Sequence, residues 1–190
     1  MKAEIRVIGI DDAPFSFEDA TTPVIGVVMR GGSYIEGILR TDVAVDGIDA
    51  TEKLSDMLVR SRYREQLKAV IIDGAALGGF NVVNTEQLYK NCGIPTIVVT
   101  RNRPNDKSVM KALRDHFDDW ASRWATMSRG EIFEMKTEHK PIYVKRVGLS
   151  VEEAIDIVQL CTVRGALPEP IRIAHLIAAG IKRGESYGRA

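Results

Sequence analysis

Apolar and polar positions along the chain first predict three consecutive strands. Residues 4–10 alternate and then become continuously apolar, which is typical of a central strand in a sheet. The apolar stretches at residues 22–31 and 33–47 meet at the turn sequence GGS, which predicts an antiparallel hairpin. The first part of the chain is therefore expected to form an antiparallel meander.

Helices and strands alternate in the rest of the chain. Residues 49–66 follow a helical period, with Asp49 as the expected N-cap and Glu52 completing a capping box. Ser150 and Glu153 predict a second capping box. The remaining predicted elements are strands at residues 67–73 and 94–100, a last short strand or edge segment at 140–148, and helices at 85–91, 107–125, 150–163 and 168–181.

This order of elements predicts an α/β fold with a mixed sheet and helices on both of its faces. The strands at residues 4–10, 67–73 and 94–100 would lie parallel at the centre, beside the meander. The sequence contains no internal repeat and no low-complexity linker, and 190 residues suit one well-buried domain. We therefore expect a single domain over residues 1–190, with residues 182–190 as a loose tail.

Composition indicates the cellular compartment more clearly than it indicates the reaction. Lys plus Arg equals Asp plus Glu at 26 each, so no overall field indicates nucleic acid, although a balanced total can conceal a basic face. Cys92 and Cys161 lie far apart without metal-ligand spacing, which favours a reducing cytoplasm over a disulfide framework. Acidic residues come too early for a signal peptide, and no apolar run approaches the roughly 20 residues of a membrane span. A cytoplasmic protein with no membrane partner is expected.

Two aspartates follow predicted central strands. The stretch AVIIDGAALGGFN is an apolar strand that stops at Asp73 and runs into a glycine-rich turn, and Asp11 follows the first strand. Sites in such sheets form at the carboxyl ends of strands, so neighbouring strands would bring Asp11 and Asp73 together. Close carboxylates raise each other's pKa unless a cation neutralises them, and Mg²⁺ prefers oxygen ligands. A turn-forming role for each aspartate is the alternative.

A third carboxylate would complete a magnesium site. Asp42 and Asp46 both follow the third strand, and we choose Asp46 because it stands beside Gly47, just before the helix. The glycine-rich turn after Asp73 could instead cradle phosphate. It has neither the G-x-x-x-x-G-K-[ST] nor the G-x-G-x-x-G motif, so the sequence does not favour a nucleotide-binding module.

Three stretches resemble one family. The sequence PIYVKRVGLSVEEAIDIVQLCTVRGALPEPIRIAHLIA is similar to the C-terminal part of endonuclease V proteins. SYIEGILR resembles their wedge loop, and AVIIDGAALGGF followed by GIPTIVVTR resembles their metal-binding strand and the next strand. The departures fit a largely archaeal sister family, endonuclease dU, better. The resemblance implies a ribonuclease H-like fold, which agrees with the order of elements.

The resemblance also implies catalytic roles. Asp11 and Asp73 would match the aspartates of strands one and four that bind metal, and Asp46 would match the acidic residue before the first helix. His175 would match a histidine that approaches the metal site, and Arg101 a basic residue near the scissile phosphate. From the residues alone, a lone histidine such as His175 is more often a packed structural residue, and solvated surface is the default for Arg101.

Nucleic-acid contacts follow from the same resemblance. Tyr34 matches the wedge residue that separates strands at a lesion, with Ile35 and Gly37 in the same loop; an ordinary cross-strand aromatic is the alternative. Gly78 and Gly79 would let a nucleic-acid backbone approach closely. The tryptophans of the predicted helix at 107–125, Trp120 and Trp124, are expected to pack rather than to stack on bases.

Two departures affect substrate choice. Glu36 stands where the wedge has proline, and Leu77, Gly78 and Gly79 occupy the region where endonuclease V carries a histidine. Inosine specificity is therefore not inherited. We expect an endonuclease that depends on Mg²⁺, or on Mn²⁺, and acts on DNA, or RNA, at deaminated or damaged bases. A catalytically inactive relative that binds nucleic acid or a protein is the alternative.

Overall fold

The computed structural model describes residues 4–186 and contains one large sheet with a small hairpin beside it. The strands are β1 (Arg6–Asp12), β2 (Thr21–Arg30), β3 (Tyr34–Ala44), β4 (Leu67–Asp73), β5 (Ala76–Leu77), β6 (Asn81–Val82), β7 (Thr96–Thr100), β8 (Phe133–Met135) and β9 (Ile142–Val147). The helices are α1 (Ala50–Val59), α2 (Thr85–Cys92), α3 (Asp106–His116), α4 (Trp120–Met127), α5 (Val151–Cys161) and α6 (Glu169–Arg183), with a 3₁₀ turn at Arg64–Gln66.

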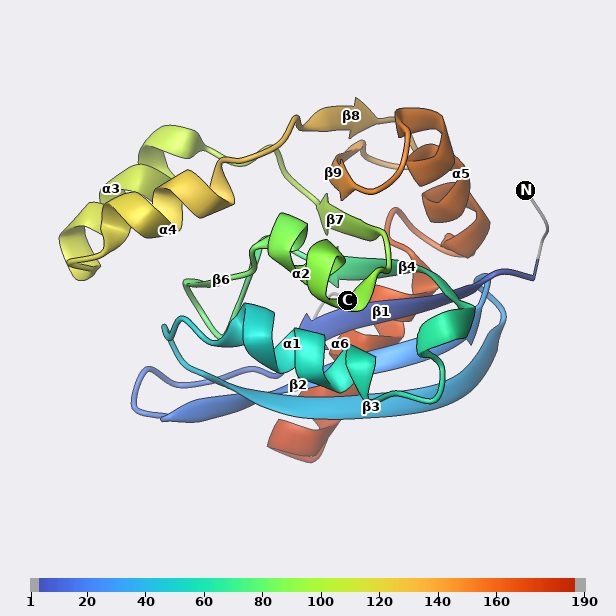
Figure 1. Cartoon of the computed structure of the whole chain (residues 1–190), viewed down its shortest axis with the longest axis horizontal. Coiled ribbons are helices and arrows are strands. Elements are labelled where there is room, and N and C mark those ends of the chain that lie inside the picture. Colours follow the sequence, from blue (N-terminus) through green and yellow to red (C-terminus); the bar gives the residue numbers. More distant parts are fainter. Residues whose placement is uncertain (1–3, 187–190) are drawn as a thin grey trace.

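The large sheet has the order β3-β2-β1-β4-β7-β9-β8 (Figure 1). β1, β4 and β7 are parallel at its centre, and β2 and β3 extend it on one side as an antiparallel meander. β9 pairs antiparallel with β7 on the other side, and β8 pairs with β9. The predicted mixed α/β sheet is confirmed, including the parallel arrangement of its three central strands.

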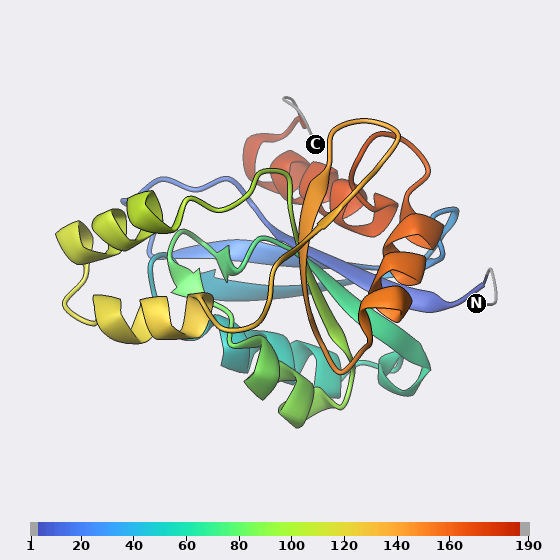
Figure 2. The same ribbon diagram turned by 90° about the horizontal axis from the view of Figure 1, so that it is seen from above.

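Helices cover both faces of the sheet, as Figure 2 shows. In β1, Ile8 and Ile10 belong to the core beneath α1 and α2, whereas Val7 belongs to the core beneath α5. Alternation along the strand causes this division, because successive side chains point to opposite faces. On the α5 side, α6 crosses β1 so closely that a Cβ at Gly9 would lie 2.2 Å from the carbonyl carbon of Pro170. Gly9 therefore lets α6 rest on the centre of the sheet.

The predicted helix at residues 107–125 is wrong in its length. The structure has two helices there, α3 and α4, which form an arm beside the sheet (Figures 1 and 2). The chain is extended at Phe117, with φ −135° and ψ 129°. The Phe117 ring packs edge-on against Phe80, at 5.6 Å between centroids, and Arg123 lies over it. These contacts outweigh the helical pattern of the local sequence.

One of the two predicted capping boxes is present in the structure. Ser150 and Glu153 form both bonds of the predicted capping box. Asp49 precedes α1 as predicted but makes no capping bond, because its carboxylate accepts from Ala44 N and Asn81 Nδ2 instead. The predicted box with Glu52 is therefore wrong.

The last helix extends into the segment that the sequence predicts to be a loose tail. α6 includes Lys182 and Arg183, where the sequence predicts the start of a tail, and residues 187–190 of that tail lie outside the described residues. Lys182 pairs with Asp19 at 2.9 Å.

Within residues 4–186, none of the helices has the length and apolar character that crossing a membrane would require.

Candidate active site at the carboxyl ends of the central strands

Asp11 and Asp73 lie at the carboxyl ends of two adjacent parallel strands. Ile10 of β1 is paired with Ile72 of β4, so the next residue in each strand points to the same face of the sheet. That face is the one covered by α5 and α6. Asp11 is buried, with 6% of its surface exposed. The strand adjacency predicted for the two carboxylates is therefore confirmed.

Burial and mutual repulsion act on Asp73. Desolvation raises the pKa of its carboxyl group to about 6, and the nearby charge of Asp11 adds to the rise. Arg101 and His175 act in the opposite direction, because positive charge favours the carboxylate form. The site is therefore one in which negative charge is costly and added positive charge is stabilising.

His175 of α6 contacts Asp11 directly. Its Nδ1 lies 2.8 Å from Oδ2 of Asp11. This bond raises the pKa of His175, against the opposing effect of burial, and the charges of Asp11 and Asp73 raise it further. The close packing of α6 at Gly9 positions the histidine over the end of β1. His175 is thus part of the carboxylate cluster, whereas the sequence alone left open a purely structural role.

Asp12 is the residue that the sequence analysis missed. It is the last residue of β1 and points to the opposite face from Asp11, where its Oδ2 accepts a bond from Gly78 N at 2.9 Å. Burial raises the pKa of Asp12 to about 6, and Asp11 and Asp73 contribute in the same direction. The pattern that could have indicated Asp12 is the pair of consecutive aspartates. If the strand continues to residue 12, the two side chains point to opposite faces of the sheet.

Asp46 reaches the glycine-rich turn rather than the strand ends. Its backbone is left-handed, with φ 54°, and its Oδ1 accepts from Phe80 N at 2.8 Å. Its own N–H donates to Gly78 O at 2.7 Å. The rival candidate Asp42 lies on the surface of β3 and pairs with Arg40 at 3.0 Å. The metal role of Asp46 stays a prediction.

The glycine-rich turn links these carboxylates. Gly78 and Gly79 have φ values of 59° and 89°, which residues with a side chain rarely adopt. A Cβ at Gly79 would lie 2.2 Å from Asp46 Oδ1. Gly78 meanwhile donates to Asp12 and accepts from Asp46. The turn thus requires glycine to connect the end of β1 with the Asp46 segment, and the approach of a nucleic-acid backbone to it stays a prediction.

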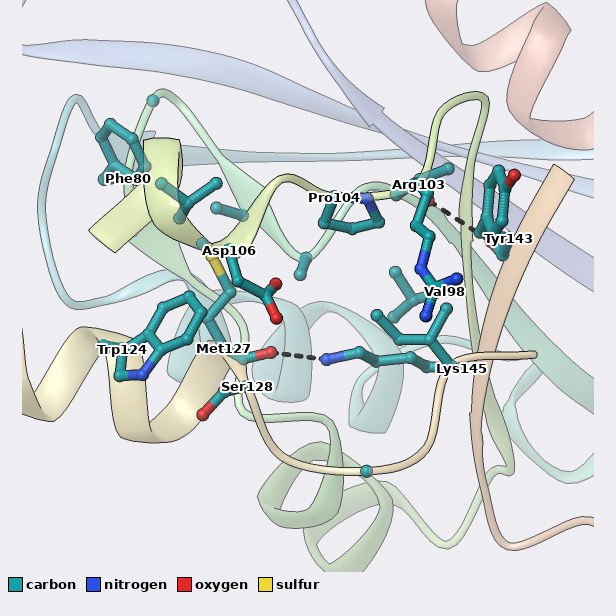
Figure 3. Close-up of a pocket in the computed structure, with 17 residues that line it drawn as sticks. Phe80, Val98, Arg103, Pro104, Asp106, Trp124, Met127, Ser128, Tyr143 and Lys145 are labelled. Carbon is teal, nitrogen blue, oxygen red and sulfur yellow. Dashed lines mark hydrogen bonds between the residues drawn. The ribbon is translucent and has the colours of Figure 1, made fainter. Parts of the chain in front are cut away.

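Arg101 follows β7, and its chain neighbours Thr100 and Arg103 line a cavity of about 490 Å³ (Figure 3). This cavity, which we call the aromatic pocket, lies between the glycine-rich turn, the end of β7 and the α3–α4 arm. Its walls include Phe80, Trp124, Tyr143, Arg103, Asp106 and Lys145. Burial lowers the pKa of Lys145, whose ammonium group donates to Met127 O at 2.6 Å. Trp124, expected to serve packing, forms part of the wall.

Tyr34 lies at the other end of the sheet from the carboxylates. It opens β3 with 62% of its surface exposed, and it pairs with Arg30, which pairs with Arg6. Arg6 precedes Asp11 by five positions on β1, which corresponds to about 17 Å along a strand. Ile35 beside it is also exposed. The wedge role of this hairpin stays a prediction, at a distance from Asp11.

The residues that follow in β3 have structural partners. Glu36 pairs with Arg6 and with Arg30, the latter at 2.8 Å, and 13% of its side chain is exposed. Its negative charge is therefore compensated within the protein. At Gly37 a Cβ would lie 2.5 Å from the hydroxyl oxygen of Tyr63, and that hydroxyl donates to Glu36 O. These contacts give Glu36 and Gly37 a packing role in the hairpin.

The donor chemistry of the site fits a hard divalent cation. Asp11 and Asp73 supply carboxylate oxygens, and the raised pKa of Asp73 indicates negative charge that a cation would stabilise. Between residues 4 and 186, however, no group of three or more acidic, histidine or cysteine side chains lies close enough to hold a metal together. Mg²⁺ needs only one or two protein carboxylates, because it keeps several waters. Two strand-end aspartates therefore suit it.

Comparison with known proteins identifies the family. A protein of the UPF0215 group from Methanothermobacter thermautotrophicus is 42% identical over 193 residues, covering 100% of this chain and 94% of that protein. A crystal structure of a protein of unknown function from Archaeoglobus fulgidus has a TM-score of 0.83 at 38% identity, covering 94% and 98% of the two chains.

More distant likeness defines the fold. Endonuclease V from Ciona intestinalis, solved with DNA containing an inosine followed by a ribo-adenosine, has a TM-score of 0.58 at 19% identity. The match covers 90% of this chain and 83% of that one, so the predicted ribonuclease H-like fold is confirmed. The family model for endonuclease dU matches residues 3–182. The chain therefore belongs to the endonuclease dU family.

Proposed function

We propose that this protein is a metal-dependent endonuclease that hydrolyses phosphodiester bonds in nucleic acid at deaminated or damaged bases. The observation that carries the proposal is the placement of Asp11 and Asp73 at the adjacent ends of β1 and β4, with His175 and Arg101 beside them. The endonuclease dU family and the ribonuclease H-like fold support nuclease chemistry in general. The metal, the substrate and the lesion are parts of the proposal.

Asp11 and Asp73 would hold Mg²⁺ or Mn²⁺, with Asp46 as the third carboxylate predicted from the sequence. A divalent ion supplies a water of lowered pKa and compensates the charge that develops on the phosphate. The protein contributes the orientation of its own ligands. Asp11 is fixed by burial and by the 2.8 Å contact with His175, so its carboxylate needs little rearrangement when substrate binds.

His175 and Arg101 act on the phosphate. Nδ1 of His175 is engaged by Asp11, which leaves the other ring nitrogen for a proton or a phosphate oxygen. The bond to Asp11 raises the pKa of His175, which favours the protonated ring. Arg101 can donate two parallel bonds to phosphate oxygens and stabilise the charge that forms during hydrolysis.

The aromatic pocket is where we place an extruded base. Its volume of about 490 Å³ lies in the range of small-molecule sites, and Phe80, Trp124 and Tyr143 offer apolar rings. Enzymes that act at a particular base in a duplex take it out of the stack and bind it between such side chains. Arg103, Asp106 and Lys145 provide polar groups that could distinguish one base from another.

Cleavage of labelled oligonucleotides tests the proposal. Duplex and single-stranded DNA and RNA carrying uracil, inosine or an abasic site would be incubated with the protein, with Mg²⁺, Mn²⁺ or EDTA. We expect metal-dependent nicking that Asp73→Ala abolishes. Asp56→Ala is the control, because this exposed aspartate of α1 pairs with Arg60 across 3.7 Å and lies outside the site. Equal nicking by the wild type and by Asp73→Ala would contradict the proposal.

A catalytically inactive nucleic-acid-binding module is the second candidate. The observation in its favour is that residues 4–186 hold no close group of three metal-binding side chains. Binding of an oligonucleotide without metal-dependent nicking in the same assay would support it.

A further inference from the structure

A second cavity opens on the other side of the segment that follows β7. Its volume is also about 490 Å³, and Arg101 and Asn102 line it, whereas Thr100, Arg103 and Pro104 line the aromatic pocket. We call this second cavity the basic cleft. Its polar lining consists of Arg101, Asn102, His139, Lys140, Arg164 and Arg172. A few residues of one connecting segment therefore separate an aromatic cavity from a basic one.

Positive charge is concentrated in the basic cleft. Within residues 4–186 no acidic residue lines it, although the whole chain is electrically balanced. Lys140 and Arg164 are exposed, and neither forms an ion pair within residues 4–186. Arg172 donates to both carboxylate oxygens of Glu169. Exposed cations gathered in a concave surface attract anions.

The basic cleft lies near the candidate active site. Arg101 acts electrostatically on both Asp73 and His175. On α6, Arg172 precedes His175 by three residues, which places the two side chains next to each other on the helix surface. An anion bound in the cleft would therefore lie beside the carboxylates, on the side away from the aromatic pocket.

We propose that the basic cleft binds the phosphates of the nucleic-acid strand next to the scissile bond. The inference rests on the proposed function and adds where the strand lies. Phosphodiesters suit this lining, since arginine and lysine bind phosphate oxygens well. Within residues 4–186 no Phe, Tyr or Trp lines the cleft, so it lacks the large aromatic surfaces on which successive bases stack. It would hold the backbone without reading sequence, while the aromatic pocket receives a base.

Salt-dependent binding tests the inference. Binding of fluorescein-labelled poly(dT) would be followed by anisotropy in EDTA, with salt between about 50 and 200 mM. The variant K140E/R164E reverses the two exposed charges of the cleft. K53E/K90E is the matched control, because it makes the same charge change at exposed lysines of α1 and α2, on the other face of the sheet.

The expected result is specific to the cleft variant. K140E/R164E should bind at least about tenfold more weakly at the lowest salt, and its slope of log affinity against log salt should be shallower by about 1.4, since each phosphate contact on a single strand contributes about 0.7. K53E/K90E should bind as the wild type does. Thermal unfolding of both variants checks that they fold, and K140Q/R164Q should show a smaller effect of the same sign.

Each contrary result has a distinct meaning. If the wild type binds and nicks oligonucleotides and K140E/R164E binds them equally well, the cleft inference is wrong and the proposed function stands. If K140E/R164E loses affinity for poly-glutamate but keeps its affinity for poly(dT), the cleft serves an acidic protein and the inference is overturned. If the wild type binds no nucleic acid at any salt, both the inference and the proposed function fail.

Discussion

Nδ1 of His175 lies 2.8 Å from Oδ2 of Asp11, although 164 positions separate the two residues in the sequence. The contact joins the last helix to the end of the first strand, directly above the central parallel strands. It forms because Gly9 allows α6 to pack against the backbone of β1. In this chain of the endonuclease dU family, the contact thus holds a histidine against a carboxylate at the end of a central strand.

Loss of the His175 imidazole should impair cleavage more than binding. We expect His175→Ala to lower the rate of nicking by on the order of 10²-fold, the lower end of the effect of a positioned acid or base. The pH–rate profile should also lose one limb, which a purely structural role would not cause. An unchanged profile in a folded His175→Ala protein would exclude a role for this histidine in proton transfer.

Asp73→Asn should separate stability from activity. The pKa of Asp73 is raised to about 6, so its ionised form is a cost to the folded metal-free protein at neutral pH. Removing the charge should raise the melting temperature in EDTA at pH 7.5 while abolishing nicking. Asp56→Asn, at an exposed position on α1, is the control for a general effect of charge removal. A lower melting temperature for Asp73→Asn than for the wild type would count against this cost.

Stability of the metal-free protein should fall as pH rises from about 4 to about 6. Asp12 and Asp73 have pKa values raised from 3.8 to about 6, so the folded protein binds more protons than the unfolded chain in this window. His175 extends the fall to higher pH, because the stability from its raised pKa is full below the unfolded value of 6.5 and is lost as pH rises through the folded one. We expect a loss on the order of 2 kcal/mol, measured by urea unfolding in EDTA.

The fall in stability between about pH 4 and about pH 6 should diminish when the Asp12 and Asp73 carboxyl groups are removed. The double variant Asp12→Asn/Asp73→Asn should show a flatter dependence of unfolding free energy on pH than the wild type. The same slope in both proteins would assign the pH dependence to other groups.

Mg²⁺ should stabilise the wild type but not Asp73→Asn. A ligand that binds only the folded state raises its stability by mass action, by about 2.7 kcal/mol at a concentration 100 times its dissociation constant. The melting temperature of the wild type should therefore rise with Mg²⁺ concentration at pH 7.5. An equal rise in both proteins would place the bound ion elsewhere.

Gly79→Ala should destabilise the protein more than Gly130→Ala. Both glycines have positive φ, at 89° and 81°, so both substitutions strain the backbone. Only at Gly79 would the new Cβ also collide, at 2.2 Å from Asp46 Oδ1, whereas nothing lies within 4 Å at Gly130. We expect about 1 kcal/mol for Gly130→Ala and roughly 2–4 kcal/mol for Gly79→Ala, measured by urea unfolding. Equal losses would show that the Asp46 contact is not required.

The sequence by itself determined the elements whose signals are local. The alternation of β1, the apolar runs of β4 and β7, and the capping box of Ser150 and Glu153 are each set by neighbouring residues, and each was predicted. The order of those elements then restricted the topology, because parallel strands with helical connections pack in few ways. The adjacency of Asp11 and Asp73 followed from that order.

Only the tertiary structure decided which side chains meet. The helix predicted at residues 107–125 breaks at Phe117 because its ring packs against Phe80. Asp49 turns from its predicted cap to bonds with Ala44 and Asn81, while Asp46 binds the turn at Phe80. These partners come from distant parts of the chain. A local pattern records the period of an element, whereas such a contact depends on how several elements pack at once.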